Sequence, residues 1–224
     1  MTALHAVIHW LEAVAGDVPA DDHWLSAAER RTLARLHVPK RRADWRLGRW
    51  TAKHAGAAVL GVAPERLAVR ALESGAPELL LDDRPARLAM SLSHSGGRAV
   101  CALAPGGTAL GCDLETIEAR SGAFEADHLT AEEREVVERG ADHDLGVTLV
   151  WSAKESAAKA IGEGWRLDPY DLVVRVPVLS GDTEWRPLRV ETAPEGEGMS
   201  GWWRVEGGQV RTMVSAPTLA PAAL

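Results

Sequence analysis

Five charged side chains in the second half of the chain are spaced so that they could act together on a phosphate. The segment "GCDLE" at 111–115 carries Asp113 and Glu115, and "WSAKESAAKAIGEG" at 151–164 carries Lys154, Glu155 and Lys159. Carboxylates are the ligands that a hard divalent cation such as Mg²⁺ prefers, and lysines can hold the phosphate oxygens that such an ion leaves exposed. The two segments therefore indicate Mg²⁺-dependent chemistry on a phosphate group.

The first of these segments is predicted to be a strand. "TALGCDLET" at 108–116 alternates in polarity, so Gly111, Asp113 and Glu115 share one face of the strand. The two carboxylates then stand about 7 Å apart, and like charges at that distance are costly unless a cation lies between them. A bare D-x-E motif is weak by itself, and a solvated strand edge is the alternative interpretation.

The second segment is predicted to be a helix with one chemical face. Trp151, Glu155 and Lys159 recur every four residues and so lie on one stripe, with Lys154 beside it. The alternative is an exposed i,i+4 pair of Glu155 and Lys159, which stabilises a helix by only about 0.3–0.5 kcal/mol. That pair does not explain why a carboxylate with flanking lysines follows a D-x-E strand in the same half.

Two segments of the first half could add phosphate contacts. "MSLSHSGGRAV" at 90–100 reads as a strand that presents Ser93 and His94 at a glycine turn, although a turn histidine is often merely exposed. "PKRRADWRLGRW" at 39–50 concentrates basic residues in an acidic protein, and arginine suits bidentate phosphate contact. A solvated helix face is the alternative for this cluster of Lys40, Arg41, Arg42, Arg46 and Arg49.

The order of predicted elements occurs twice. Capping boxes at Ser26/Glu29 and Thr130/Glu133 begin helices within 25–36 and 129–140. Each is followed by a helix that opens W-[TS]-A-K, at 50–61 and 151–162, and then by a strand, at 66–72 and 171–176. We therefore predict an α+β fold of two similar halves, 1–107 and 108–224, with a site in the cleft between them. Chance similarity of short alanine-rich helices is the alternative.

Composition limits the kinds of binding partner expected for this protein and the cellular compartment in which it is expected. The chain has 224 residues, 46% of them hydrophobic, and a formal net charge of −7, which argues against a general attraction to nucleic acid or to an anionic membrane. Cys101 and Cys112 are too few for a disulfide framework, so reduced, buried thiols are expected. No run approaches about 18 apolar residues, and the first residues lack the pattern of a signal peptide. We expect a cytoplasmic protein with no membrane or nucleic-acid partner.

These motifs together resemble a known enzyme family. "SLSHSGG", then "GCDLE", then "WSAKESAAKAIGEG" some forty residues later is similar to the Sfp-type 4′-phosphopantetheinyl transferases, whose signature is G-x-D-x-E followed by W-x-x-K-E-x-x-x-K-A-x-G-x-G. The resemblance runs with gaps from Arg41 to Gly164. It implies two similar α+β halves related by a pseudo-twofold axis, and a monomeric enzyme of the holo-[acyl-carrier-protein] synthase type that acts in secondary-metabolite biosynthesis.

The resemblance also implies a reaction and its metal site. Such an enzyme moves the 4′-phosphopantetheine group of coenzyme A to a serine hydroxyl of an apo acyl or peptidyl carrier protein and releases 3′,5′-adenosine bisphosphate. Asp113, Glu115 and Glu155 are then expected to hold Mg²⁺, with Mn²⁺ as a substitute, and Glu155 is the candidate base for the serine hydroxyl.

The remaining candidate residues are expected to bind coenzyme A. By the resemblance, Lys154, Lys159 and His94 contact its phosphates, with Ser93 nearby. Arg41 and Arg49 reach its 3′-phosphate or adenosine end, and Arg42 competes with Arg41 for this role. The chain departs from the family in having "GAP" at 75–77 where many members have G-K-P, so that Ala76 replaces a phosphate-binding lysine.

Two other functions use the same residues. A different Mg²⁺-dependent phosphohydrolase would employ the same carboxylates with water as the nucleophile. A nucleic-acid-binding protein would use the 39–50 cluster, and salt-sensitive binding would distinguish it. Neither accounts for the W-x-x-K-E-x-x-x-K segment as specifically as transfer of phosphopantetheine does.

Overall fold

A computed structural model of the chain describes residues 7–162, 167–176, 183–192 and 198–224. The chain forms two compact units, Met1–Thr108 with Pro221–Leu224, and Ala109–Ala220. Pro221–Leu224, which the predicted division assigned to the second half, belong to the first unit. The reason is that strand β12 (Ala220–Ala223) lies next to β1 (Val7–Val14) in one sheet.

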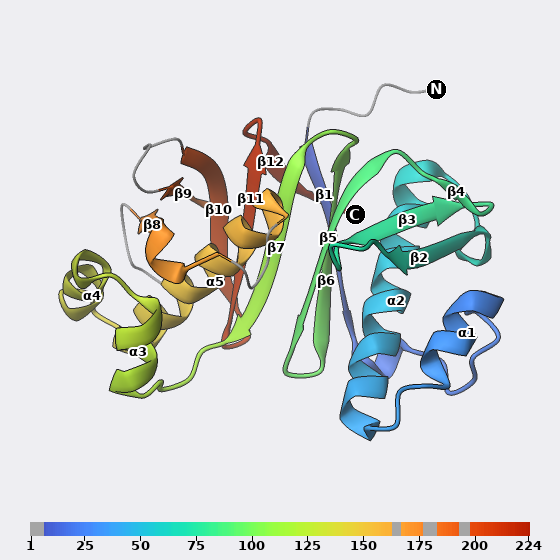
Figure 1. Ribbon diagram of the computed structural model, residues 1–224, viewed down its shortest axis with the longest axis horizontal. Helices are drawn as coiled ribbons and strands as arrows, with labels where there is room; N and C mark the ends of the chain where they lie inside the picture. The colour runs from blue at the N-terminus through green and yellow to red at the C-terminus, as the bar shows by residue number, and fades with distance from the viewer. Residues whose placement is uncertain (1–6, 163–166, 177–182, 193–197) are drawn as a thin grey trace. The chain divides into compact units, whose positions relative to one another are not determined.

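The first unit is built on a four-stranded sheet in the order β12-β1-β6-β5. Strands β5 (Leu88–Ser95) and β6 (Arg98–Pro105) form a hairpin, and a smaller sheet holds β2 (Leu67–Ala71), β3 (Pro77–Leu81) and β4 (Arg84–Pro85). The long helix α2 (Pro39–Leu60) packs against β1 and β6, as Figure 1 shows, and the short helix α1 (Ala27–Leu33) precedes it. Short 3₁₀ turns occupy Ala15–Asp17 (η1) and Pro64–Arg66 (η2).

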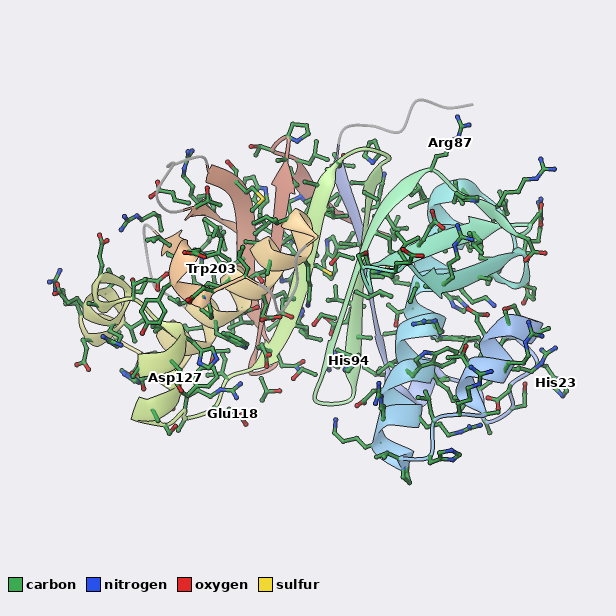
Figure 2. All side chains as sticks on the ribbon, viewed as in Figure 1. His23, Arg87, His94, Glu118, Asp127 and Trp203 are labelled. Atoms are coloured by element: carbon green, nitrogen blue, oxygen red, sulfur yellow. The ribbon has the colours of Figure 1, made fainter. Side chains whose placement is uncertain are left out.

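The second unit is a five-stranded sheet covered by helix α5 (His143–Ile161), which lies against β7 and β11 (Figure 1). The sheet order is β7 (Ala109–Thr116), β11 (Gln209–Ala216), β10 (Gly198–Glu206), β9 (Arg186–Thr192) and β8 (Leu172–Arg175). Helices α3 (Gly122–His128) and α4 (Ala131–Glu138) precede α5, and the 3₁₀ turn η4 (Pro169–Asp171) follows it. Trp203 on β10 is fully buried in the core beneath α5 (Figure 2).

The predicted α+β class is confirmed, and the elements follow the repeated order. Both capping boxes form, with Ser26 and Thr130 as N-caps of α1 and α4. The two W-[TS]-A-K segments are the later parts of α2 and α5, which begin earlier than predicted because Pro39 is a favourable first helical residue and Asp142 is a side-chain N-cap. Each helix ends at a glycine with positive φ, Gly61 or Gly162.

Two predictions from composition concern cysteines and membrane spans. Cys101 and Cys112 are both buried thiols outside any disulfide, as expected for cysteines in apolar strands. In the part of the chain that the structure describes, no helix is long and apolar enough to cross a membrane.

Candidate active site

The D-x-E strand and the K-E helix lie in direct contact because position 111 is a glycine. A Cβ atom placed on Gly111 would lie 1.7 Å from the carbonyl oxygen of Ser156 and 2.9 Å from the backbone nitrogen of Ala160, both in α5. Only a residue without a side chain allows β7 and α5 to approach this closely. Asp113, two residues along the strand, faces the same helix, as the alternation predicted.

Lys159 joins the helix to the strand at this contact. Its ammonium donates to the Oδ1 atom of Asp113 at 2.7 Å and to the carbonyl oxygen of Cys112 at 3.0 Å. Burial disfavours the charge on Lys159, but the Asp113 carboxylate and other neighbours outweigh burial and raise its pKa. The ion pair of Lys159 is therefore with buried Asp113 on the strand, whereas the surface alternative paired it with Glu155.

The three candidate carboxylates influence one another electrostatically. Burial raises the pKa of Glu155 to about 7, with further contributions from the negative charges of Asp113 and Glu115. Burial and Asp113 likewise raise the pKa of Glu115, against the opposing effect of Arg120, whose guanidinium lies 3.5 Å away. Within the described part of the chain Glu155 makes no hydrogen bond or ion pair. The cluster is therefore a region of unbalanced negative charge that favours a cation.

The donor chemistry of this cluster fits a hard divalent cation. All three side chains offer carboxylate oxygens, which suit Mg²⁺ or Mn²⁺, and the ammonium of Lys159 already places one positive charge against Asp113. Over the residues that the structure describes, no three His, Cys, Asp or Glu side chains are gathered closely enough to hold a metal ion as they stand. Asp113, Glu115 and Glu155 therefore have the right chemistry for the ion. The contact that is already formed in this cluster is the ion pair between Lys159 and Asp113.

Lys154 lies in a different environment from the one that phosphate binding requires. Only 2% of the residue is exposed, and its ammonium pairs with Glu133 at 2.7 Å. The same ammonium donates to the carbonyl oxygens of His128 and Pro169, both at 2.8 Å. Burial lowers the pKa of Lys154, and Glu133 opposes that shift. Three protein oxygens thus occupy the three N–H groups that a phosphate would need.

A buried hydroxyl network anchors α5 to the sheet opposite Asp113. The hydroxyl of Thr212 on β11 lies 2.9 Å from that of Ser152 and 2.7 Å from that of Ser156, and it donates to the Ser152 carbonyl oxygen at 2.9 Å. Thr212 is the register partner of Asp113 in the β7–β11 pair. Sequence reasoning missed Thr212 because no motif extends beyond the K-E helix and a strand threonine is unremarkable by itself. Residues 163–164, the end of that motif, lie outside the described residues.

The candidate residues of the first unit share one pocket. A cavity of about 540 Å³ is lined by residues from the start of α2, the end of β5 and the small sheet. It includes all four residues predicted from the first half, Arg41, Arg49, Ser93 and His94. His94 lies near the tip of the β5–β6 hairpin (Figure 2), where Gly96 and Gly97 both have positive φ. Lys40, Trp45 and Arg70 line the same pocket and were not among the predicted site residues.

The pocket is suited to an anionic ligand. Burial lowers the pKa of Arg49, whose guanidinium carbon lies 4.5 Å from the ring centroid of Trp45. The buried Nε of Arg49 has no hydrogen-bond partner among the described residues. Lys40 is paired with Asp44 at 2.8 Å and Arg70 with Glu78. An aromatic ring beside a partly buried, unsatisfied guanidinium can receive a base and a phosphate.

The basic cluster at 39–50 divides between two roles. Arg42 and Arg46 both pair with Asp22, at 3.2 and 2.9 Å, and both also donate to backbone carbonyl groups. Arg41 and Arg49 instead line the pocket. Of these two neighbouring arginines, Arg41 lines the pocket and Arg42 is committed to contacts within the protein.

Comparison with known proteins bears on the second unit. No curated protein matches the chain. Residues 109–184, which hold β7, α5 and their carboxylates, match the family model described as the 4′-phosphopantetheinyl transferase superfamily, and the match supports that superfamily without singling out its Sfp-type members.

Proposed function

We propose that this protein transfers the 4′-phosphopantetheine group of coenzyme A to a serine hydroxyl of an apo acyl or peptidyl carrier protein, as a holo-[acyl-carrier-protein] synthase of the Sfp type. The observation that carries the proposal is the family match over 109–184, the segment in which Asp113, Glu115, Glu155 and Lys159 come together. The same segment carries the D-x-E and K-E motifs on which the resemblance to these enzymes mainly rests.

The proposed reaction exchanges one P–O bond for another. The serine oxygen attacks the β-phosphorus of coenzyme A, and a new P–O bond to serine forms. The bond from that phosphorus to the bridging oxygen of the pyrophosphate breaks, and 3′,5′-adenosine bisphosphate leaves with the electron pair. Lys159 is suited to stabilise charge on the phosphate oxygens, since its neighbours favour its protonated form.

Glu155 is the candidate base for the serine proton. Burial and the neighbouring carboxylates raise its pKa to about 7 in the metal-free site, and a bound Mg²⁺ would lower that value and favour the ionised form that a base needs. It is half-buried and carries no ion pair within the described residues, so its oxygens remain available. Asp113, Glu115 and Glu155 would hold Mg²⁺, which when bound neutralises charge on the pyrophosphate.

The pocket of the first unit is the proposed site for the adenosine 3′-phosphate end of coenzyme A. Arg41 and Arg49 would contact the phosphate, with Ser93 and His94 toward the pyrophosphate. Ala76 replaces the lysine of the family pattern, and Arg70 on the neighbouring strand lines the same pocket with a guanidinium. Arg70 is paired with Glu78, so it brings no unpaired positive charge in place of that lysine.

The experiment is to incubate the protein with coenzyme A, Mg²⁺ and a panel of apo carrier proteins of fatty-acid, polyketide and peptide-synthetase type. We expect a carrier to gain the mass of phosphopantetheine, and excess chelator or Asp113→Asn to abolish the gain. Glu135→Gln is the matched control, because this exposed carboxylate pairs with Arg139 on its own helix and does not line the pocket. Release of 3′,5′-adenosine bisphosphate without any acceptor would instead identify a phosphohydrolase.

A further inference from the structure

One buried ion pair occurs in both units. In the first unit Glu29 of α1 faces Lys53 of α2, with 3.5 Å between Oε2 and Nζ. In the second unit Glu133 of α4 faces Lys154 of α5, with 2.7 Å between the same atoms. All four residues are at most 3% exposed. A buried charge requires a partner, so neither pair is incidental to its unit.

Each carboxylate also binds two backbone groups. Glu29 and Glu133 close the capping boxes of their helices by accepting the N–H of Ser26 or Thr130, in both cases at 2.8 Å. Their other oxygens accept the N–H of the strand that follows the long helix, Val69 at 2.9 Å in β2 and Val174 at 2.7 Å in β8. One glutamate therefore joins a short helix, a strand and a long helix in each unit.

The lysines make corresponding contacts as well. Lys53 donates to the carbonyl oxygen of Trp24, and Lys154 to that of His128, which lies at the same distance before its capping box. The Trp24 ring packs edge-on against Trp50 at 5.2 Å, and the His128 ring against Trp151 at 4.5 Å. The lysine of the W-[TS]-A-K segment thus holds the same position in the same framework twice.

The second unit differs from the first in the residues that follow the lysine of the W-[TS]-A-K segment. Where α5 has Glu155, α2 has His54, and where α5 has Lys159, α2 has Ala58. Neither of the two described strands against which α2 mainly packs carries a D-x-E motif, since β1 reads "VIHWLEAV" and β6 reads "RAVCALAP". What the two units share is therefore the framework, whereas Glu155 and Lys159 of the K-E segment have no counterpart in the first unit.

We propose that Lys154 is a positioning residue that acts through Glu133, and that it is not a ligand of the coenzyme A phosphates. Successive helical residues are rotated by about 100°, so holding Lys154 against α3, α4 and η4 fixes which side of α5 faces β7. That rotation directs Glu155 and Lys159 toward the D-x-E strand. The second part of the proposal rests on the proposed function of the site.

The test combines two measurements on the full-length protein. The first is the melting temperature without ligand. The second is the dissociation constant of coenzyme A in the presence of Mg²⁺, measured by calorimetry at a temperature where every variant is folded. The variants are Lys154→Met, the double variant Glu133→Gln/Lys154→Met, Lys159→Met, and Lys53→Met as the stability comparator from the first unit. Methionine keeps the unbranched stem of lysine and removes its charge. The double variant also removes the carboxylate that Lys154→Met leaves buried and unpaired.

We expect Lys154→Met and Lys53→Met to lower the melting temperature by similar amounts, on the order of 10 °C. The double variant keeps the packed stems that seat α5 and leaves no unpaired charge, so it should recover part of that loss and bind coenzyme A within about threefold of wild type. Lys159→Met should bind about tenfold more weakly or worse. Folded double variant that binds as weakly as Lys159→Met would identify Lys154 as a phosphate ligand and overturn the proposal.

Two further outcomes are decisive. An unchanged melting temperature in Lys154→Met would show that the ion pair has no framework role. If wild type binds no coenzyme A, the proposed function fails, while the loss in Lys154→Met and its partial recovery in the double variant still decide whether Lys154 belongs to the framework.

Discussion

Replacing Gly111 by alanine tests the close contact of β7 and α5. The added Cβ would lie 1.7 Å from the Ser156 carbonyl oxygen, and real Cβ contacts essentially never fall under 3.0 Å, so strand and helix must separate by at least 1.3 Å (3.0 − 1.7). The obstructing atoms belong to the backbone of α5, so no side-chain rotation relieves the overlap. Overpacking of this kind costs about 1–3 kcal/mol, and we expect the upper end of that range.

The assay is urea unfolding followed by far-ultraviolet circular dichroism, with hydrogen exchange of peptides from β7 and α5 to locate the change. The matched control is Gly48→Ala in α2, where a Cβ meets nothing within 4 Å and the gain in helix propensity should stabilise the protein by up to about 1 kcal/mol. A Gly111→Ala protein within about 0.5 kcal/mol of wild type, with unchanged exchange in both elements, would refute the reasoning.

Three other predictions use the same structure. Folding raises the pKa of Glu155 from 4.5 to about 7, so the metal-free protein should lose stability as pH rises between these values. Glu155→Gln should flatten that part of the plot of melting temperature against pH. Parallel plots for the variant and the wild type would contradict this prediction. Gly48→Leu should fill the first-unit pocket and weaken coenzyme A binding about tenfold or more in calorimetry, without lowering the melting temperature. Unchanged affinity would contradict the assignment of coenzyme A to this pocket. Thr212→Val leaves Ser152 and Ser156 without their hydroxyl partner and should lower the free energy of unfolding in urea by roughly 1–3 kcal/mol. An unchanged free energy of unfolding would show that this hydroxyl network does not anchor α5.

Local chemistry explains why several elements could be predicted from the sequence. A capping box satisfies N–H groups within four residues, so Ser26 and Thr130 mark helix starts whatever packs on them. The alternation around Asp113 likewise predicts which side chains share a face, because the period of a strand is a property of its backbone. These patterns were sufficient for the α+β class and for the repeated order of elements.

The ion-pair partners of the charged residues could not be predicted from local sequence patterns. In the motif Lys154 and Lys159 look equivalent, yet one is buried against Glu133 and the other reaches Asp113. The difference arises because α4 packs over one side of α5 and β7 over the other, and no spacing within α5 encodes that arrangement. Thr212 is a similar case, since its importance depends on a strand paired with β7 from about a hundred residues away.

The sequence by itself determined the two capping boxes, the two W-[TS]-A-K helices, the D-x-E strand and the α+β class, because periodicity, capping and motif spacing are short-range properties of the chain. The tertiary structure alone decided which cations lie at the pocket or at the carboxylates and which are paired elsewhere in the protein. Arg41 and Arg49 line a pocket while Arg42 and Arg46 are bound to Asp22, and Lys159 stays at the carboxylates while Lys154 is enclosed. The physical reason is that a buried charge must find its partner wherever the fold places one, and only the packed chain determines where that is.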